Sequence, residues 1–509
     1  MSLRQTTASD AAPPNWLLLF LVLLTAARLA FAAVIPLTED EAYYRLWAGA
    51  LQFGYYDHPP MIAWWIRAGT SLAGDNPLGV RLVPTLACGL TGLLVFDLAR
   101  RLGADARTAA RASVWFNATL LVAAGGSLAT PDAALTPFWV LCLWCLARTG
   151  GRRDGLWWSA AGVAAGLACL SKYSGLFLAP GVLIWLAATP GGLARLRRPW
   201  PWAAALIAAA IFGLNVAWNA EHHWLTFDKQ FGRVAGHGLR PQFLIELLIG
   251  QLLLLNPLIS VFVVRGLWPP WRSAPVAGRL DATLLLATSA PFAAYLALHG
   301  LHDRVQAHWP APIYPALAMI AAAAAELAPP GGWLATARRW AAPFGLGLAA
   351  LALGHLALPA SDVRGLKDPT AMLRGWPAFA SAVGRIGQAR GAAWTGALSY
   401  ATTAELAAAG APGPVVEIIE RDRYPAGDAS WRADLSRPGL VVDLDRRVDA
   451  ALLSGCFASV TPLGEIVRSQ GASRPERYAA FLVAQPRRDI LAQGCRPGPE
   501  PAAAAGAKR

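Results

Sequence analysis

The chain has 509 residues, of which 55% are hydrophobic and only 15% are charged. Soluble domains carry about 25% charged residues, so this composition excludes an ordinary soluble protein and indicates a polytopic membrane protein. The net charge of +13 would suit a nucleic-acid-binding protein, but the arginines gather in short loops between apolar runs. Positive charge in such loops sets membrane topology, and nucleic acid is therefore excluded as a partner.

Apolar runs of roughly spanning length recur over the first 360 residues. The first run is too long for the core of a signal peptide, so we expect it to be a retained span. Together the runs predict an all-α membrane part with about eleven transmembrane helices, near 15–36, 78–98, 110–126, 133–148, 156–170, 173–188, 201–218, 243–264, 282–298, 311–328 and 341–358.

The loops between these spans alternate in character. One set is rich in arginine, at 100–111, 148–153, 195–198, 265–279 and 338–339. The other set is poorer in cations and holds most of the unusual polar residues, at 37–77, 127–132, 171–174, 219–241 and 299–310. By the positive-inside rule the first set and the N-terminus are cytoplasmic, whereas the second set and the C-terminus are extracytoplasmic.

The first outer loop combines acids, tyrosines and a double proline in "LTEDEAYYRLWAGALQFGYYDHPP". Asp40 follows the predicted membrane boundary at Pro36 by a few residues. The double proline after Asp57 and His58 stiffens entry into a helix over Met61–Leu72, whose apolar stripe suits a position flat on the membrane. The loop is therefore predicted to hold its acidic groups in place from both ends, at the membrane boundary near Pro36 and at the helix over Met61–Leu72.

Two ionisable residues lie in very short outer connections that are nearly engulfed by apolar sequence, namely Asp132 and Lys172. An ionisable group at that depth is costly unless it is paired or functional. Carboxylates and cations on one membrane face suit transfer from a phosphate-linked substrate, with a carboxylate as general base and a cation at the leaving phosphate. Asp57 with His58 could also hold a divalent metal.

From about residue 360 the charge rises and the apolar runs shorten to strand length, as in "GPVVEII", "PGLVVDL" and "YAAFLVAQ", separated or preceded by helical stretches such as "TTAELAAAG". This pattern predicts a small C-terminal α/β extracytoplasmic domain. The predicted organisation is a transmembrane domain over 1–359, this domain over 360–496 and a disordered tail over 497–509. Cys456 and Cys495 are expected to pair if this part lies in an oxidising compartment.

The motifs of the first outer loop resemble those of GT-C membrane glycosyltransferases. The resemblance is to the branch of protein O-mannosyltransferases and bacterial lipid A aminoarabinose and galacturonic acid transferases. It rests on Asp40-Glu41, on Asp57-His58 before the double proline, and on Asp132 in the next outer loop. "GLACLSKYSGLFLAPG" and "RVQAHWPAPIYPALAMI" are similar to further segments of bacterial members, so the similarity covers about residues 15–330. The aminoarabinose enzymes have lysine where this chain has His58.

The resemblance implies an inverting transferase that takes a sugar from a polyprenyl-phosphate carrier without a nucleotide. It implies catalytic roles for Asp40 as general base, for Asp132 in positioning substrate and for Glu41, and a possible metal at Asp57 and His58. The residues expected to bind substrate or the lipid phosphate are His58, Lys172, Tyr173, Arg233, Arg304, His308, Tyr55 and Tyr56.

Several partners and alternatives follow from this hypothesis. The expected enzyme is a monomer in the bacterial cytoplasmic membrane, with membrane lipids, a polyprenyl-phosphate sugar donor, and lipid A or another envelope glycolipid as acceptor. A protein acceptor is the first alternative within the enzyme class, and a cell-envelope polysaccharide is the second. A lipid-linked sugar transporter would instead place ionisable groups near mid-span in repeated segments, and a structural or sensor protein would not require Asp132 and Lys172 in tight loops.

Overall fold

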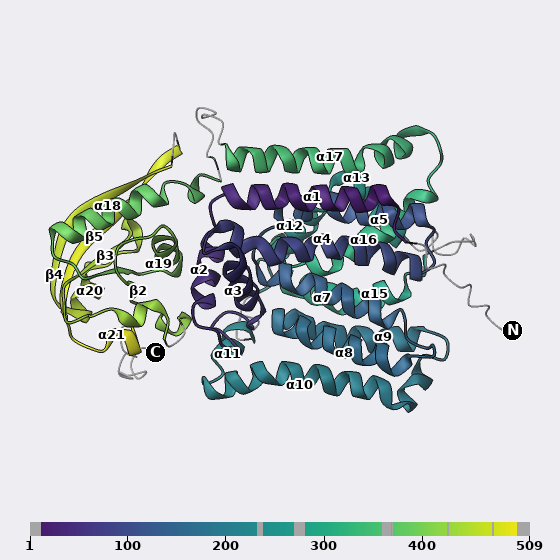
Figure 1. Ribbon diagram of the computed structural model, residues 1–509, viewed down its shortest axis with the longest axis horizontal. Coiled ribbons are helices and arrows are strands. Elements are labelled where there is room, and N and C mark those ends of the chain that lie inside the picture. The colour runs from purple at the N-terminus through teal and green to yellow at the C-terminus, as the bar shows by residue number, and fades with distance from the viewer. Residues whose placement is uncertain are drawn as a thin grey trace, which may run out of the picture. The chain divides into compact units, whose positions relative to one another are not determined.

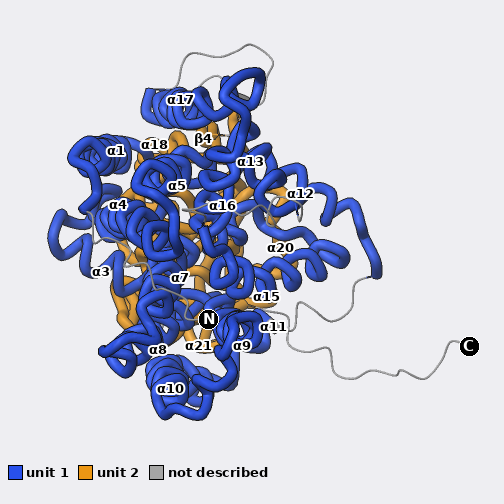
Figure 2. Tube along the Cα trace, turned by 90° about the vertical axis from the view of Figure 1, so that its right-hand side faces the viewer, with its two compact units in different colours: residues 1–35, 57–358 blue, residues 36–56, 359–509 orange. Residues whose placement is uncertain are grey.

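The computed structural model describes residues 12–231, 238–268, 280–358, 368, 370–424, 427–470 and 473–495. The chain forms two compact units, which Figure 2 shows in different colours. Unit 1 comprises residues 1–35 and 57–358, and unit 2 comprises residues 36–56 and 359–509. The beginning of the first outer loop, which we expected within the transmembrane part, thus packs with the C-terminal residues instead.

Unit 1 is helical in its described residues, and Figure 1 shows its long helices running roughly parallel to one another. The predicted helix after the double proline is confirmed as α3. The principal helices are α1 (Asn15–Val34), α3 (Met61–Ala73), α4 (Pro77–Arg101), α5 (Ala106–Ala118), α6 (Leu120–Gly125), α7 (Pro131–Leu146), α8 (Asp154–Ser171), α9 (Leu178–Ala188), α10 (Pro199–Glu221), α11 (Leu225–Phe231), α12 (Pro241–Leu254), α13 (Pro257–Leu267), α15 (Thr283–Gly300), α16 (Tyr314–Glu326) and α17 (Gly332–Ala357).

Five described helices are long and apolar enough to cross a membrane, namely α1, α4, α10, α15 and α17, and a bent pair brings the number to six. Three further apolar segments are shorter, at Pro131–Leu146, Tyr173–Ala188 and Ala311–Glu326. The predicted span at 110–126 is divided between α5 and α6. Apolar helical spans are therefore present as expected, whereas the number eleven stays a prediction.

The predicted single span at 243–264 is wrong in its geometry, because α12 and α13 meet at an angle of 112°. Asn256 between them adopts φ 75°, a left-handed conformation that asparagine tolerates better than most residues. Its Nδ2 donates to the Ala341 carbonyl at 2.6 Å, and its Oδ1 accepts from Leu258 N at 3.1 Å. Pro257 then begins α13 without needing a hydrogen bond for its nitrogen.

Helices α8 and α10 approach closely because a glycine on α8 faces the backbone of α10. A Cβ atom at Gly162 would lie 2.4 Å from the carbonyl oxygen of Ala204, so only glycine fits there. Small residues of this kind let membrane helices pack backbone to backbone. The contact fixes α8, and Lys172 follows directly at the C-terminal end of that helix.

Unit 2 contains a five-stranded sheet in the order β2-β1-β3-β5-β4. β1 pairs in parallel with β2 and β3, and β5 pairs antiparallel with β3 and β4. The small C-terminal sheet is therefore confirmed. Its elements, with the helices packed around it, are β1 (Trp394–Ala397), β2 (Val415–Glu417), β3 (Gly439–Leu444), β4 (Phe457–Gln470), β5 (Ser473–Pro486), α2 (Glu39–Ala48), α18 (Trp376–Ala389), α19 (Tyr400–Ala408), α20 (Ala450–Cys456) and α21 (Ile490–Gln493).

Cys456 and Cys495 form a disulfide across a sequence separation of 39 residues, with Cα atoms 5.7 Å apart. Closing a loop of that length is worth about 4 kcal/mol in the chain-entropy model.

Replacing both cysteines by serine is therefore expected to destabilise unit 2 by an amount of that order, measured by thermal unfolding of the purified chain. A reducing agent should lower the unfolding temperature of the natural chain but not that of the double variant. Equal sensitivity of the two would contradict the assignment.

Candidate functional site

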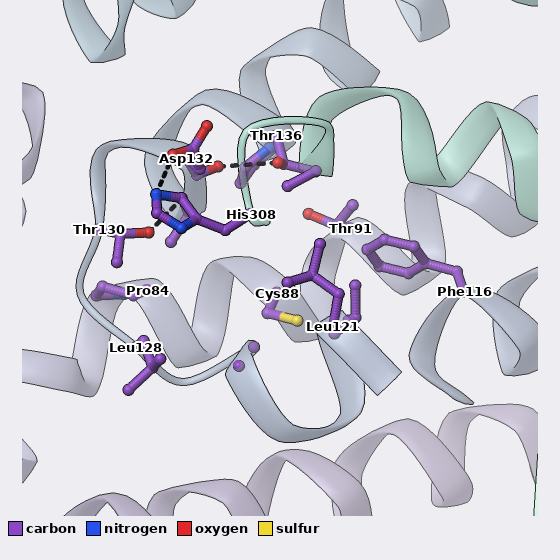
Figure 3. Close-up of a pocket in the computed structure, with 16 residues that line it drawn as sticks. Pro84, Cys88, Thr91, Phe116, Leu121, Leu128, Thr130, Asp132, Thr136 and His308 are labelled. Carbon is purple, nitrogen blue, oxygen red and sulfur yellow. Dashed lines mark hydrogen bonds and ion pairs between the residues drawn. The ribbon is translucent and has the colours of Figure 1, made fainter. Parts of the chain in front are cut away.

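Unit 1 brings together three of the predicted site residues. Asp132 lies in the first turn of α7, where Thr130 caps the helix, and it is 3% exposed. Lys172 Nζ lies 2.8 Å from Asp132 Oδ1 and 2.7 Å from Oδ2. His308 Nε2 lies 3.5 Å from the same Oδ2. The side chains of Asp132 and His308 point toward each other in Figure 3.

The local structure explains how the charge of the Asp132 carboxylate is compensated although the side chain is buried. The N-terminus of α7 carries the positive end of the helix dipole, which favours an anion there. Lys172 supplies a full positive charge to both carboxylate oxygens, and its Nζ lies 5.2 Å from the centre of the Trp309 ring. Burying such a pair is costly, so its retention favours a functional use of these charges.

Asp132 and His308 belong to the wall of a cavity of about 140 Å³. Most of the other lining side chains are apolar or small, and they come from α4, α5, α6 and α7. Figure 3 shows Pro84, Cys88, Phe116 and Leu121 around the same space. The cavity can therefore accept an apolar group whose polar end lies beside the buried carboxylate and the imidazole.

Tyr173 follows Lys172 and lies in a buried hydrogen-bonded network between α8 and α10. Its hydroxyl lies 3.0 Å from Asn215 Oδ1 and 3.4 Å from Asn219 Nδ2. Both asparagines are fully buried. The structure thus gives Tyr173 a packing role beside Lys172, and direct contact with substrate stays a prediction.

The remaining predicted contacts of unit 1 have other recorded partners or lie outside the described residues. Arg304 Nη2 lies 3.2 Å from Glu246 Oε2 in an exposed ion pair. Arg233 lies outside the described residues. Asp57 and His58 lie in the turn before α3, where Gln230 Nε2 donates to the Asp57 carbonyl at 2.6 Å.

The predicted metal site is not supported by the arrangement of possible ligands. Over the described ranges, no group of three or more His, Cys, Asp or Glu side chains lies close enough to hold a metal ion. Asp57 and His58 are therefore not part of such a group. A metal at Asp57 and His58 therefore stays a prediction, and no chemical step is assigned to one.

Unit 2 contains Asp40 and Glu41, the predicted acidic pair at the start of the first outer loop, on helix α2. Thr38 and Glu41 form a reciprocal capping box, in which Glu41 Oε2 accepts from Thr38 N at 3.0 Å and Glu41 N donates to Thr38 Oγ1 at 3.2 Å. Glu41 is fully buried, so the structure gives it a helix-capping role. Asp40 is only partly buried, and Tyr400 Oη lies 3.3 Å from its Oδ1.

The two predicted tyrosines of this loop differ in their surroundings. Tyr55 stacks on Trp47 with ring centres 4.6 Å apart, and its hydroxyl lies 3.1 Å from the Trp47 carbonyl. It is 2% exposed and supports the loop from within. Tyr56 is partly buried, and the guanidinium of Arg423 lies 5.0 Å from its ring centre.

Sequence reasoning missed the C-terminal residues that surround α2, chiefly Tyr400 and Arg423. They lie more than 300 residues from Asp40 in the chain, and neither belongs to a recognisable motif. The only available signal was the aromatic content of "LSYATTAEL" and "RDRYP" in an otherwise ordinary α/β segment. Their position beside α2 depends on tertiary packing, so it could not be read from local patterns.

Glu405 on α19 provides a test of the electrostatics of unit 2. It is 5% exposed, and burial raises its pKa from 4.5 to about 8, opposed by Arg468 and supported by Glu39 and Glu41. Because the folded-state pKa lies above the unfolded value, its contribution to stability is complete below about pH 4.5 and is lost as the pH rises through about 8.

We expect Glu405→Gln to remove this loss. The free energy of unfolding should then decrease less steeply with pH between pH 5 and 8. The slope of the variant should differ from that of the natural chain by up to about 1.4 kcal/mol per pH unit. Thermal unfolding of the purified chain across this range measures the change, with Glu465→Gln on exposed β4 sequence as the matched control. An unchanged pH dependence in Glu405→Gln would contradict the burial effect.

Sequence comparisons show that the chain is similar to glycosyltransferases. Residues 57–218 match the family model described as dolichyl-phosphate-mannose-protein mannosyltransferase. The chain is 28% identical over 292 residues to the lipid A galacturonosyltransferase RgtD of Rhizobium johnstonii, covering 55% of this chain and 59% of RgtD. It is 34% identical over 137 residues to the undecaprenyl phosphate-alpha-4-amino-4-deoxy-L-arabinose arabinosyl transferase of Pseudomonas paraeruginosa, covering 26% of this chain and 23% of that relative. The matches span less than two thirds of either relative.

Comparison with solved structures shows the fold. ArnT from Cupriavidus metallidurans bound to undecaprenyl phosphate has a TM-score of 0.57 at 16% identity, covering 92% of this chain and 98% of ArnT. The mycobacterial arabinofuranosyltransferase AftD has a TM-score of 0.52 at 14% identity, covering 95% of this chain and 40% of AftD. The resemblance to the GT-C branch expected from the loop motifs is confirmed.

Proposed function

We propose that the chain is an inverting glycosyltransferase that moves a sugar from a polyprenyl-phosphate carrier to lipid A or another envelope glycolipid. The observation that carries this proposal is the buried carboxylate of Asp132, which pairs with Lys172 and lies with His308 at the wall of an apolar cavity. Two relatives whose names specify lipid A galacturonosyl transfer and undecaprenyl-phosphate-linked aminoarabinose transfer support the same reaction class. The ArnT-like fold agrees with it.

The cluster in unit 1 suits the donor end of this reaction. The carrier's isoprenoid is apolar, and burial of each CH₂ group contributes about 0.8 kcal/mol, so an apolar cavity needs few specific contacts to bind it. Lys172 is held by Asp132 and can stabilise the negative charge that develops on the leaving phosphate. His308 can donate a further hydrogen bond there, and Arg233 and Arg304 remain predicted phosphate contacts.

Asp40 is proposed as the general base. In the reaction, an acceptor hydroxyl oxygen forms a bond to the anomeric carbon while the bond from that carbon to the phosphate oxygen breaks. The hydroxyl proton passes to the Asp40 carboxylate, and polyprenyl phosphate leaves with the bonding electrons. Attack from the face opposite the leaving group inverts the anomeric centre. Because a phosphate is already a good leaving group, the proposed reaction requires no nucleotide.

The proposed location is a bacterial cytoplasmic membrane, with the N-terminus inside and the catalytic loops and C-terminal domain outside. The alternation of arginine-rich and arginine-poor loops supports this topology. The disulfide in unit 2 supports an oxidising compartment for the C-terminal part. The proposal also includes about eleven transmembrane spans and a monomeric enzyme.

The direct test is transfer by the purified chain. The chain in detergent is supplied with undecaprenyl phosphate carrying galacturonic acid or aminoarabinose, together with lipid A, and the products are measured by mass spectrometry. Sugar-bearing lipid A with release of undecaprenyl phosphate is expected.

A second measurement compares envelope lipids and proteins of cells with and without the gene. The family model matched by residues 57–218 bears the name of a protein mannosyltransferase. Loss of a sugar from protein, with lipid A unchanged, would therefore replace the glycolipid acceptor by a protein acceptor. No difference in either fraction, and no transfer in the purified system, would overturn the proposed function.

A further inference from the structure

Residues of the C-terminal part of unit 2 anchor helix α2, which carries Asp40. Tyr43 Oη donates to the carbonyl oxygen of Arg423 at 3.2 Å, and Trp47 Nε1 donates to the same oxygen at 3.3 Å. The ring centre of Tyr43 lies 5.1 Å from that of Tyr400 and 5.8 Å from that of Tyr424. The helix is thereby held along one face by a segment nearly 400 residues later in the chain.

Tyr400 contacts the proposed general base directly. Its hydroxyl lies 3.3 Å from Asp40 Oδ1. Burial raises the pKa of Tyr400 well above its ordinary value of 10, and the negative charges of Asp40 and Glu39 add to the rise. The phenol therefore keeps its proton at neutral pH, and it donates to the carboxylate rather than competing with it as an anion.

Arg423 fixes the ring that makes this contact. Its guanidinium lies 4.8 Å from the centre of the Tyr400 ring and 5.0 Å from that of Tyr56. Glu420 pairs with the same guanidinium. Cation–π contacts of this kind orient aromatic side chains. Tyr400 is thus held in one orientation by a cation that itself bridges the first outer loop and the C-terminal part of the chain.

We propose that Tyr400, supported by Arg423, is a positioning residue that aims and tunes the Asp40 carboxylate. The C-terminal part of unit 2 then contributes to catalysis by positioning the proposed base. The inference rests on the proposed function, because it takes Asp40 to be the base. A hydrogen bond donated to a carboxylate favours its charged form and restricts its orientation.

Other charged groups belong to the same electrostatic surroundings, because they interact with Asp40 or with Glu39, Tyr400, Glu405 or Arg423 beside it. The pH test therefore compares variants with the natural chain. The charged groups come from α2 itself, from α19, from the turns at 420–423 and 445–447, and from β4 and β5. These groups are Glu39, Glu41, Glu405, Glu420, Arg423, Arg447, Arg468 and Glu476.

Tyr400→Phe removes the hydroxyl and keeps the ring against Arg423. We expect kcat to fall about 10- to 100-fold, with KM for the donor changed less than 2-fold, as expected for loss of an interaction with the reacting group. The acidic limb of the kcat profile should move to higher pH by about one unit, because the carboxylate loses a donor that favours its charged form. Steady-state rates of the full chain between pH 5 and 9 measure both effects.

Tyr478→Phe is the matched control, because its hydroxyl also lies 3.3 Å from a carboxylate, that of Glu476, within the same unit. It should keep kcat and the pH profile of the natural chain, and thermal unfolding verifies that both variants are folded. A natural kcat in Tyr400→Phe, or a loss of kcat without movement of the acidic limb, would overturn the inference. Full activity in Asp40→Asn would instead overturn the base assignment, so the two failures are distinguishable.

Discussion

Asp40→Asn is expected to reduce transfer by at least about 10³-fold while the chain stays folded. Asparagine has nearly the shape of aspartate and can still accept a hydrogen bond from Tyr400, so α2 and its surroundings should persist. It cannot accept the acceptor's proton, and positioned general bases contribute about 10²–10⁴-fold in rate. Initial rates with undecaprenyl-phosphate sugar and purified lipid A measure the loss, and binding of the carrier alone should be retained.

Glu39→Gln provides the matched control for this prediction. Glu39 precedes Asp40 on the same helix. The pKa of Glu39 is raised mainly by burial and further by the nearby negative charge of Asp40. Its replacement removes one acidic group from the same turn, and we expect activity within a few-fold of the natural chain. If the two variants lost activity equally, the effect would be general electrostatics, and Asp40 would not be the base.

Glu41→Gln separates the two roles that Glu41 could have. Glutamine at this position preserves a capping box, because its side-chain oxygen can still accept from the Thr38 backbone. The helix start is thus retained while the negative charge is lost. A large loss of transfer in this variant would support the catalytic role predicted for Glu41, and retained transfer would leave its role as capping alone.

The sequence was most informative where function conflicts with solvation. Asp132 and Lys172 were singled out because ionisable groups in short loops between apolar runs are costly, and the structure brings them within 2.8 Å of each other. The helix after the double proline and the C-terminal strands also follow local rules of proline placement and alternation. Such features depend on residues that are neighbours in the chain.

The features that could not be predicted depend on distant contacts. Hydropathy reports an average over a window, so it reads 243–264 as one span although Asn256 turns the chain by means of a left-handed backbone and a bond to Ala341. No local pattern indicates that 36–56 packs with residues after 358. Tyr400 and Arg423 acquire their importance only through that packing, and an aromatic and an arginine in an α/β domain are otherwise unremarkable.

The Asp132–Lys172 pair permits stability and catalysis to be measured separately. Lys172→Met leaves a 3% exposed carboxylate without its cation, and breaking a buried ion pair on one side costs about 3–5 kcal/mol. We expect this variant to lose both stability and at least about 100-fold in kcat with polyprenyl-phosphate sugar, since it removes the proposed cation at the leaving phosphate. Thermal unfolding and initial rates are measured on the same preparations.

The double variant Asp132→Asn, Lys172→Met then decides what the pair is for. Neutralising both partners removes the unpaired buried charge, so most of the lost stability should return, as it does when buried pairs are replaced together. Activity should not return, because the phosphate still lacks its cation. Arg304→Met, which breaks an exposed pair with Glu246, should change stability by less than about 1 kcal/mol and calibrates the comparison. Recovery of transfer together with stability in the double variant would mean that the pair only holds α7 and α8 in place, and the leaving-group role would then have to be assigned to another cation.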